Sequence, residues 1–387
     1  MTPPGRVALI VLDGVGMGAC PDQVAYGDAG SDTLGNLARA VGGLDLPVLE
    51  RLGLGCARPL AGMRCHGPTA AHGVAIPRSH GKDSTTGHWE LCGVVLERPF
   101  PTYPEGFPAS VIDEFARRTG RPVIGNTVAS GTAIIAELGA RHQETGAWIV
   151  YTSVDSVFQV AAHESVVPLD ELYAACRTAR ALLTGAHGVS RVIARPFTGG
   201  GPGGFVRTPH RRDFSLEPVG PTLLDRLDEA GVPRLGVGKV DDLFAGRAIA
   251  SRHVDSNAAA CDAIAEGLRL LDHGLLFANV VEFDQTWGHR NDVPGFYEGL
   301  RALDWLLPDL VAPLRHGDLM FLTADHGNDP TTPSTDHSRK AVPLLVAGPG
   351  VRPVALGERD FADVGATIAD YFSVPSSAGR SFLGRLL

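Results

Sequence analysis

The sequence predicts an α/β fold, in which a parallel β-sheet is covered by helices on both faces. Short runs rich in valine, isoleucine and leucine alternate with longer segments of helical periodicity, which is the pattern of parallel sheets. The composition is that of a globular protein, because 44% of the 387 residues are hydrophobic and 20% are charged. This length allows one large domain together with a smaller one, each with its own apolar core.

The expected strands are short apolar runs bounded by turn-forming residues. In chain order they cover residues 7–12, 148–152, 190–194, 234–238, 275–283, 318–323 and 342–347.

The expected helices show apolar residues on one face. They cover residues 168–184, 221–230, 256–271, 296–311 and 360–372. In the second of these, Pro221 suits the first turn, and Gly231 follows as a C-terminal stop. Leu223, Leu224 and Leu227 share one face, so this helix is expected to cover a sheet.

Two stretches rich in proline and glycine, residues 99–104 and 198–204, are expected to lie outside helices and strands. The first is a candidate hinge at which the chain leaves one domain. We therefore expect an inserted domain over residues 101–216, and a core in which residues 1–100 pair with residues 217–387.

The charge and the cysteine pattern exclude several classes of protein. A formal charge of −9 offers no broad basic surface for nucleic acid or an anionic membrane, so a phosphate site must be a local cluster. No apolar run approaches the roughly 20 residues of a membrane span. The cysteines are scattered and are expected to be buried thiols in a reducing compartment, which predicts a cytoplasmic protein. No obligate protein partner is evident. The cysteines are Cys20, Cys56, Cys65, Cys92, Cys176 and Cys261.

Three expected strands run into aspartates, and histidines follow these aspartates closely. The carboxyl ends of strands in such sheets form the ligand crevice, so these side chains are expected to converge. A single aspartate there more often caps a helix or stabilises a turn, but a set of six is enough for two metal ions, and the mixed ligands suit manganese or zinc. The six are Asp13, Asp284, His289, Asp325, His326 and His337.

A candidate nucleophile lies in the segment from Gly81 to Glu90, where hydroxyls occupy a glycine-flanked turn that is expected to open a helix. Backbone N–H groups at such a turn bind anions, and a metal ion would lower the pKa of a hydroxyl. An N-cap cluster of serine and threonine explains the same residues equally well.

Several segments resemble the signature motifs of the phosphopentomutase family, in that family's order and across nearly the whole chain. This family belongs to the alkaline phosphatase superfamily, so the resemblance implies an alkaline-phosphatase-like core that binds two metal ions and an inserted α/β cap domain. The segments are Asp13-Gly14-Val15-Gly16, Gly81 to Glu90, Tyr151 to Gln159, Ala194-Arg195-Pro196-Phe197 and Asp325 to His337.

The resemblance implies two Mn²⁺ sites, with Ser84 bridging them as the phosphorylated nucleophile. Several family members carry threonine at this position, and Thr85 is therefore the alternative nucleophile in this chain. The implied ligands are Asp13, Asp325 and His326 for one ion, and Asp284, His289 and His337 for the other.

The resemblance also implies substrate contacts. Arg195 and Arg207 have a physical reason to bind phosphate, because a guanidinium can donate to two phosphate oxygens at once. Arg211 and Arg212 are interpreted as surface charge. The implied contacts are Ser153, Asp155 and Val157 for the sugar phosphate, and Arg195, Arg207 and Lys239 for phosphate.

The activity that the resemblance implies interconverts ribose 1-phosphate, or deoxyribose 1-phosphate, and the corresponding 5-phosphate. A phosphoenzyme would donate to the free end of the pentose phosphate, and the bisphosphate would reorient and return its other phosphoryl group. A sugar bisphosphate is expected to prime the enzyme.

Alternative functions share some of these features. The nearest is a metal-dependent phosphatase or sulfatase on the same core, followed by a cofactor-independent phosphoglycerate mutase. A nicotinamide-cofactor site is suggested by Gly14, Gly16 and Ala19, but Pro21 interrupts the required helix. A metal-binding protein without catalysis is the last alternative, and metal-dependent turnover would exclude it.

Overall fold

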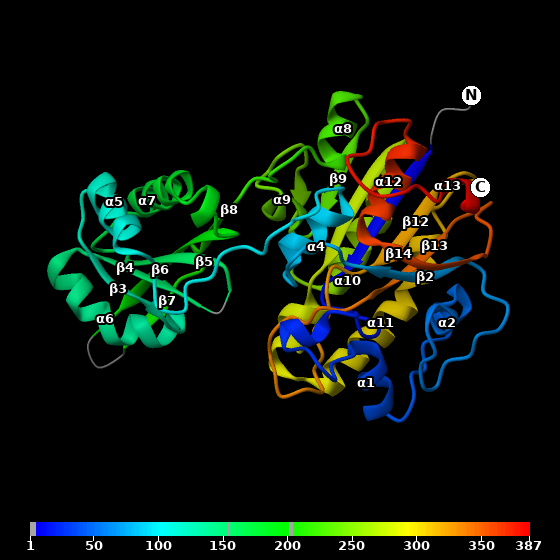
Figure 1. Cartoon of the computed structure of the whole chain (residues 1–387), viewed down its shortest axis with the longest axis horizontal. Coiled ribbons are helices and arrows are strands. Elements are labelled where there is room, and N and C mark those ends of the chain that lie inside the picture. Colours follow the sequence, from blue (N-terminus) through cyan, green and yellow to red (C-terminus); the bar gives the residue numbers. More distant parts are fainter. Residues whose placement is uncertain (1–4, 154, 201–203) are drawn as a thin grey trace. The chain divides into compact units, whose positions relative to one another are not determined.

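The computed structural model describes residues 5–153, 155–200 and 204–387. Within these residues the chain divides into two compact units. Unit 1 is formed by the two ends of the chain, up to Pro99 and from Pro218, and unit 2 runs from Phe100 to Glu217. Figure 1 shows the elements of both units. The role of unit 2 as a cap domain stays a prediction.

Unit 1 is built on an eight-stranded sheet in the order β10-β9-β11-β1-β12-β13-β2-β14. Helices cover it on both faces, which confirms the predicted fold class; for example, α10 packs on β9 and β11, and α12 packs on α4 and β14. The strands are β1 (Arg6–Leu12), β2 (Ala71–Ile76), β9 (Arg234–Val237), β10 (Ser251–Arg252), β11 (Gly274–Val280), β12 (Leu319–Thr323), β13 (Val342–Ala347) and β14 (Ala355–Asp360).

The helices of unit 1 include six that were not predicted from periodicity, α1 to α4, α9 and α13, all of them short. They are α1 (Thr33–Ala40), α2 (Pro47–Leu52), α3 (Leu54–Ala57), α4 (Ser84–Leu91), α8 (Leu223–Glu229), α9 (Val240–Leu243), α10 (Asn257–Leu270), α11 (Val293–Val311), α12 (Phe361–Tyr371) and α13 (Leu383–Leu386), with 3-10 turns at Gln23–Tyr26 and Gly288–Arg290 and a π-turn at Phe283–Trp287.

Unit 2 has a six-stranded sheet, in which β3-β4-β5-β6-β7 are neighbours and β8 also pairs with β6. Its core packs Phe115, Trp148 and Phe158 between the sheet and two helices, α5 and α7. The elements are β3 (Val123–Val128), β4 (Trp148–Thr152), β5 (Val157–His163), β6 (Arg191–Gly199), β7 (Phe205–Arg207), β8 (Arg212–Ser215), α5 (Ala109–Thr119), α6 (Gly131–Thr145), α7 (Leu169–Leu182) and a 3-10 turn at Gly185–His187.

Several details differ from the prediction. The sheet of unit 1 is mixed, because β13 runs antiparallel to both β12 and β2. Thr198 and Gly199 were expected outside any element but end β6, where Thr198 pairs with Val206, whereas residues 201–203 lie outside the described ranges. Helix α8 begins one residue after its N-cap Thr222, so Pro221 precedes the helix.

The cysteine prediction was wrong for one pair, because Cys56 and Cys65 form a disulfide. The other four cysteines are free and buried, as expected. Among the described residues, no helix is both long and apolar enough to span a membrane.

Candidate metal centre

Three neighbouring strands bring the predicted ligands to one edge of the sheet in unit 1. Strand β1 lies between β11 and β12 and is parallel to both. Leu12 is level with Val280 of β11, and Val11 is level with Thr323 of β12, so all three strands end together. All residues of β1 are buried, which explains its uninterrupted apolar sequence.

Asp13 follows β1 directly, and Asp325 follows β12 after one alanine. Asp284 differs from the prediction, because β11 ends at Val280 and Asp284 lies in the π-turn Phe283–Trp287. This turn aims the carboxylate back at the sheet edge. Such π-turns occur often at functional sites.

The first group of candidate ligands is Asp13, Asp325 and His326, all buried, with candidate ligand atoms within 4.8 Å of one another. Nε2 of His326 lies 3.2 Å from Oδ1 of Asp13 and 3.5 Å from Oδ2 of Asp325. Oδ1 of Asp325 accepts backbone N–H groups of Gly14 and His326. Oδ2 of Asp325 is buried and accepts no hydrogen bond, although Nδ1 of His88 lies 3.2 Å away, and this fits an oxygen that binds a cation.

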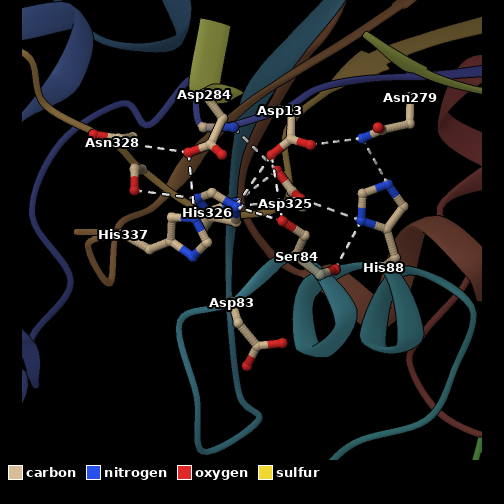
Figure 2. A network of polar contacts seen from close by, with 12 residues as sticks. Asp13, Asp83, Ser84, His88, Asn279, Asp284, Asp325, His326, Asn328 and His337 are labelled. Carbon is tan, nitrogen blue, oxygen red and sulfur yellow. Dashed lines mark hydrogen bonds and ion pairs between the residues drawn. The ribbon is translucent and has the colours of Figure 1, made fainter. Parts of the chain in front are cut away.

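The second group is Asp284, His289 and His337, whose ligand atoms also lie within 4.8 Å of one another. Nε2 of His289 is 3.0 Å from Oδ2 of Asp284, and Nε2 of His337 is 3.3 Å from Oδ1. The two Nε2 atoms are 3.2 Å apart. The rings of His326 and His337 stack with centroids 4.0 Å apart, so the two groups are adjacent (Figure 2).

Hydrogen bonds at Nδ1 leave Nε2 of two histidines free to bind a metal ion. Nδ1 of His289 is 2.6 Å from the carbonyl oxygen of Thr335, and Nδ1 of His326 is 3.2 Å from that of Gly327. A carbonyl only accepts, so Nδ1 carries the proton in each case. This arrangement is typical of histidines that bind metal through Nε2.

The charges of the candidate ligands at this sheet edge also favour the binding of cations. Burial and the charge of Asp325 raise the pKa of Asp13 above its usual range. Burial alone would raise the pKa of Asp284, but His337 and His289 hold it well below that range. Three buried carboxylates this close repel one another, and divalent cations would remove that repulsion. The donor set therefore fits two divalent metal ions.

Ser84 presents its hydroxyl to the first group. It is the first residue of α4, and its Oγ lies 3.0 Å from Nε2 of His326 and 3.4 Å from Oδ1 of Asp13 (Figure 2). Gly87 allows this approach, because a Cβ there would lie 2.2 Å from the carbonyl oxygen of Asp325. The helix therefore packs directly on the end of β12.

The neighbouring hydroxyls play other parts. Asp83 is the N-cap of α4, where it accepts the backbone N–H of Thr86, and it also accepts the hydroxyl of Thr86 at 2.6 Å. The cap of α4 is therefore Asp83, and not the cluster of serine and threonine that was considered for this segment. Thr85 is buried. Among these hydroxyls, the contacts with Asp13 and His326 are made by Ser84.

Asn328, which was not predicted to belong to the site, supports the second group. Its Nδ2 donates to Oδ1 of Asp284 at 2.8 Å. His88 and Asn279 were also missed, although His88 lies inside the segment from Gly81 to Glu90, and Asn279 is a polar residue in the apolar strand β11. These two positions could therefore have been noticed in the sequence.

The predicted substrate contacts are divided between the units. Lys239 lies in unit 1 just before α9, with Nζ 2.5 Å from Oε1 of Gln285, the residue after Asp284. In unit 2, the hydroxyl of Ser153 accepts the backbone N–H of Asp155 at 3.3 Å.

The other predicted contacts lie in the strands of unit 2. The side chain of Val157 is buried at the start of β5, and its backbone N–H donates to the carbonyl oxygen of Asp155 at 3.0 Å. Arg195 donates from Nε to Oε1 of Gln159, and burial lowers the pKa of Arg195. Arg207 ends β7 and is exposed. Arg211 is held by Asp213 through two 2.8 Å hydrogen bonds.

Comparisons with known proteins identify relatives over nearly the full chain. Residues 5–376 match the metalloenzyme superfamily. The chain is 54% identical to the phosphopentomutase of Carboxydothermus hydrogenoformans, covering 98% of this chain and 99% of that protein. It is 56% identical to the phosphopentomutase of Anaeromyxobacter sp. strain K, with the same coverage.

Solved structures share the fold at low sequence identity. The PH0037 protein of Pyrococcus horikoshii aligns with a TM-score of 0.51 at 16% identity, covering 96% of this chain and 98% of that one. The phosphoglycerate mutase of Leishmania mexicana aligns with a TM-score of 0.50 at 15% identity, covering 98% and 97%. These likenesses concern the fold alone.

Proposed function

The chain belongs to the phosphopentomutase family of the metalloenzyme superfamily, and we propose that Ser84 carries the transferred phosphoryl group beside two divalent metal ions. The chain is accordingly an isomerase that moves a phosphoryl group on a pentose phosphate and uses divalent metal. The observation that carries the proposal is the place of the Ser84 hydroxyl, 3.0 Å from His326 and 3.4 Å from Asp13.

One metal ion is held by Asp13, Asp325 and His326, and the other by Asp284, His289 and His337. The supporting observations are the two compact groups and the buried Oδ2 of Asp325, which accepts no hydrogen bond. When bound, the ions supply positive charge that lowers the pKa of the hydroxyl and neutralises phosphoryl oxygens. The mixture of carboxylate and imidazole ligands suits manganese.

The chain's own residues give the reaction its order. In the resting enzyme Ser84 is phosphorylated, and its phosphoryl group passes to the free hydroxyl of the pentose phosphate, while the proton of that hydroxyl passes to the freed Ser84 oxygen. The resulting bisphosphate reorients, and its other phosphoryl group returns to Oγ of Ser84, whose proton passes to the sugar oxygen that is freed. No water is consumed, so isomerisation proceeds without release of phosphate. A sugar bisphosphate primes unphosphorylated enzyme by the same transfer.

The substrate is ribose 1-phosphate or deoxyribose 1-phosphate and the corresponding 5-phosphate. The predicted contacts Ser153, Asp155, Val157, Arg195, Arg207 and Lys239 remain part of the proposal. Arg195 and Lys239 already make polar contacts with uncharged side-chain amides, which a phosphate could replace.

In the decisive experiment the protein is given ribose 5-phosphate, manganese and a trace of sugar bisphosphate. Ribose 1-phosphate and inorganic phosphate are then both assayed in the same sample. Isomerisation with phosphorylation of Ser84, located by mass spectrometry, supports the proposal. Phosphate release without isomerisation would instead indicate a phosphatase. Metal analysis of the active protein tests the proposed two ions.

We also place the protein in the cytoplasm. The four free, buried cysteines support this location, whereas the disulfide between Cys56 and Cys65 does not. Alkylation of thiols in rapidly quenched cells, followed by mass spectrometry, would show whether this pair is reduced in its native compartment.

A further inference from the structure

A buried polar pair, His88 and Asn279, lies behind the first group of ligands. His88 is on α4 and has no exposed surface, and Asn279 is on β11 and is 1% exposed. Neither side chain is among the candidate ligands. Figure 2 shows both side chains directed at the ligand carboxylates from the side opposite the second group.

The hydrogen bonds fix the orientation of both side chains. Nδ2 of Asn279 is 3.1 Å from Oδ2 of Asp13 and 3.2 Å from Nε2 of His88. A carboxylate only accepts, so the amide NH₂ group faces Asp13 and can donate its second hydrogen to His88. Nε2 of His88 is then the acceptor, and the proton of the neutral ring is on Nδ1.

Nδ1 of His88 connects the pair to the nucleophile. It lies 2.8 Å from the carbonyl oxygen of Ser84 and 3.2 Å from Oδ2 of Asp325. The His88 ring stacks on Phe277 of β11 with centroids 5.8 Å apart, which restrains its rotation. One continuous set of contacts therefore joins Asp13, Asn279, His88 and the backbone of Ser84.

We propose that His88 and Asn279 are positioning residues, which hold the first turn of α4, and so the Ser84 hydroxyl, in register with the carboxylates of Asp13 and Asp325. This inference rests on the proposed function of Ser84 and of the metal ligands. Partners behind metal ligands commonly alter metal affinity or activity by about 10–100-fold when they are removed. A ring buried only for packing would alter stability and leave the rate at each folded site unchanged.

The test compares His88→Leu and Asn279→Leu, which remove the polar contacts, with His88→Asn, which keeps an N–H donor near the position of Nδ1. The matched control is Thr367→Val, because Thr367 is also buried in unit 1, on α12, and its hydroxyl hydrogen-bonds to the backbone of Asp363 and Phe382 rather than to a candidate ligand. Thr367→Val is expected to lower the unfolding temperature and leave the rate unchanged.

Each variant is titrated for the number of sites that accept phosphate from a sugar bisphosphate, and the isomerisation rate is expressed per titrated site. Manganese affinity is measured by calorimetry. We expect both leucine variants to lose about 10–100-fold in rate per site or in manganese affinity, with KM for the pentose phosphate little changed, and His88→Asn to recover part of the loss.

The inference is overturned if the leucine variants match the wild type in rate per site and manganese affinity while their unfolding temperatures fall, as for Thr367→Val. If they do not fold, the same comparison is made between His88→Asn and Asn279→Ala, and wild-type values in both would overturn it. A wild-type enzyme that is never phosphorylated on Ser84 would instead contradict the proposed function.

Discussion

The hydroxyl of Ser84 lies 3.0 Å from Nε2 of His326, and it reaches this position because α4 begins at Ser84. Asp83 caps the helix through the backbone of Thr86, and Gly87 lets the helix approach the carbonyl of Asp325. The cap and the glycine thus place the Ser84 hydroxyl beside the candidate metal ligands. Mutation can therefore test the role of Ser84 separately from the roles of the neighbouring hydroxyls.

Ser84→Ala is expected to abolish isomerisation while metal content stays near that of the wild type, because six other side chains form the two candidate ligand groups. Ser84→Thr should retain activity, since it keeps a hydroxyl at the same position. Thr85→Val is the control and should remain active. Turnover of ribose 5-phosphate and metal analysis check both expectations. An active Ser84→Ala variant would show that Ser84 is not the nucleophile and would assign that role to Thr85 or Thr86.

Asn328→Leu is expected to weaken metal binding at the second group by about 10–100-fold, because it removes the 2.8 Å hydrogen bond that orients Asp284. Calorimetric titration of manganese into metal-free protein measures this effect. Asn36→Leu is a control, because Asn36 donates to Asp329 rather than to a candidate ligand. Equal manganese affinity in Asn328→Leu and the wild type would contradict the orienting role.

Arg339→Lys is expected to destabilise unit 1 by about 3 kcal/mol, because a lysine cannot reproduce the contacts of this buried guanidinium. Arg339 donates to the carbonyl oxygens of Pro77, Ser79 and Gly81 at 2.6–2.9 Å, and to Asp22 at 2.7 Å. These bonds hold the segment that leads into α4. Denaturant unfolding measures the loss.

Arg301→Lys is the matched control for this substitution. Arg301 is half-exposed on α11 and pairs with Glu298 one turn earlier, so its replacement should change the free energy of unfolding by less than about 0.5 kcal/mol. Similar losses for both variants would show that Arg339 does not hold the segment.

The sequence predicts that the candidate ligands gather at one sheet edge, because the aspartates among them follow buried strands. A strand covered on both faces reads as an apolar run, so the polar residue that ends it is conspicuous, as at Asp13 and Asp325. Asp284 was placed less accurately, because Val281 and Phe283, on either side of Glu282, continue the apolar pattern past the end of β11. Periodicity does not distinguish a strand from a π-turn there.

Features that depend on distant partners could not be predicted. The direction of β13 is set by its pairing with β2, whose strand pattern in residues 71–76 is weak. The disulfide requires Cys56 and Cys65 to meet across a loop, and spacing alone does not reveal pairing. The place of His88 depends on Asn279, 191 positions away in the sequence.

Asp225 is expected to make the stability of unit 1 depend on pH. Its carboxylate caps α8 by accepting the N–H and hydroxyl of Thr222, and it pairs with Arg247 at 2.7 and 3.0 Å. Burial alone would raise the pKa of Asp225, but the hydrogen bonds from Thr222 and the Arg247 guanidinium outweigh it and hold the pKa below the usual range. The folded state therefore favours the ionised form.

Because the pKa is lower in the folded state than the value of about 3.9 in the unfolded chain, this stabilisation is fully present above about pH 5 and is lost as pH falls through the folded pKa. Asp225→Asn should cost about 1–3 kcal/mol at neutral pH, and its difference from the wild type should shrink on acidification. Denaturant unfolding at about pH 7, 5, 4 and 3 measures the difference in the free energy of unfolding between Asp225→Asn and the wild type. Asp272→Asn, at a highly exposed position, is the control and should show no such difference. A cost for Asp225→Asn that stays constant down to about pH 3 would mean that the ionised carboxylate is not the stabilising group.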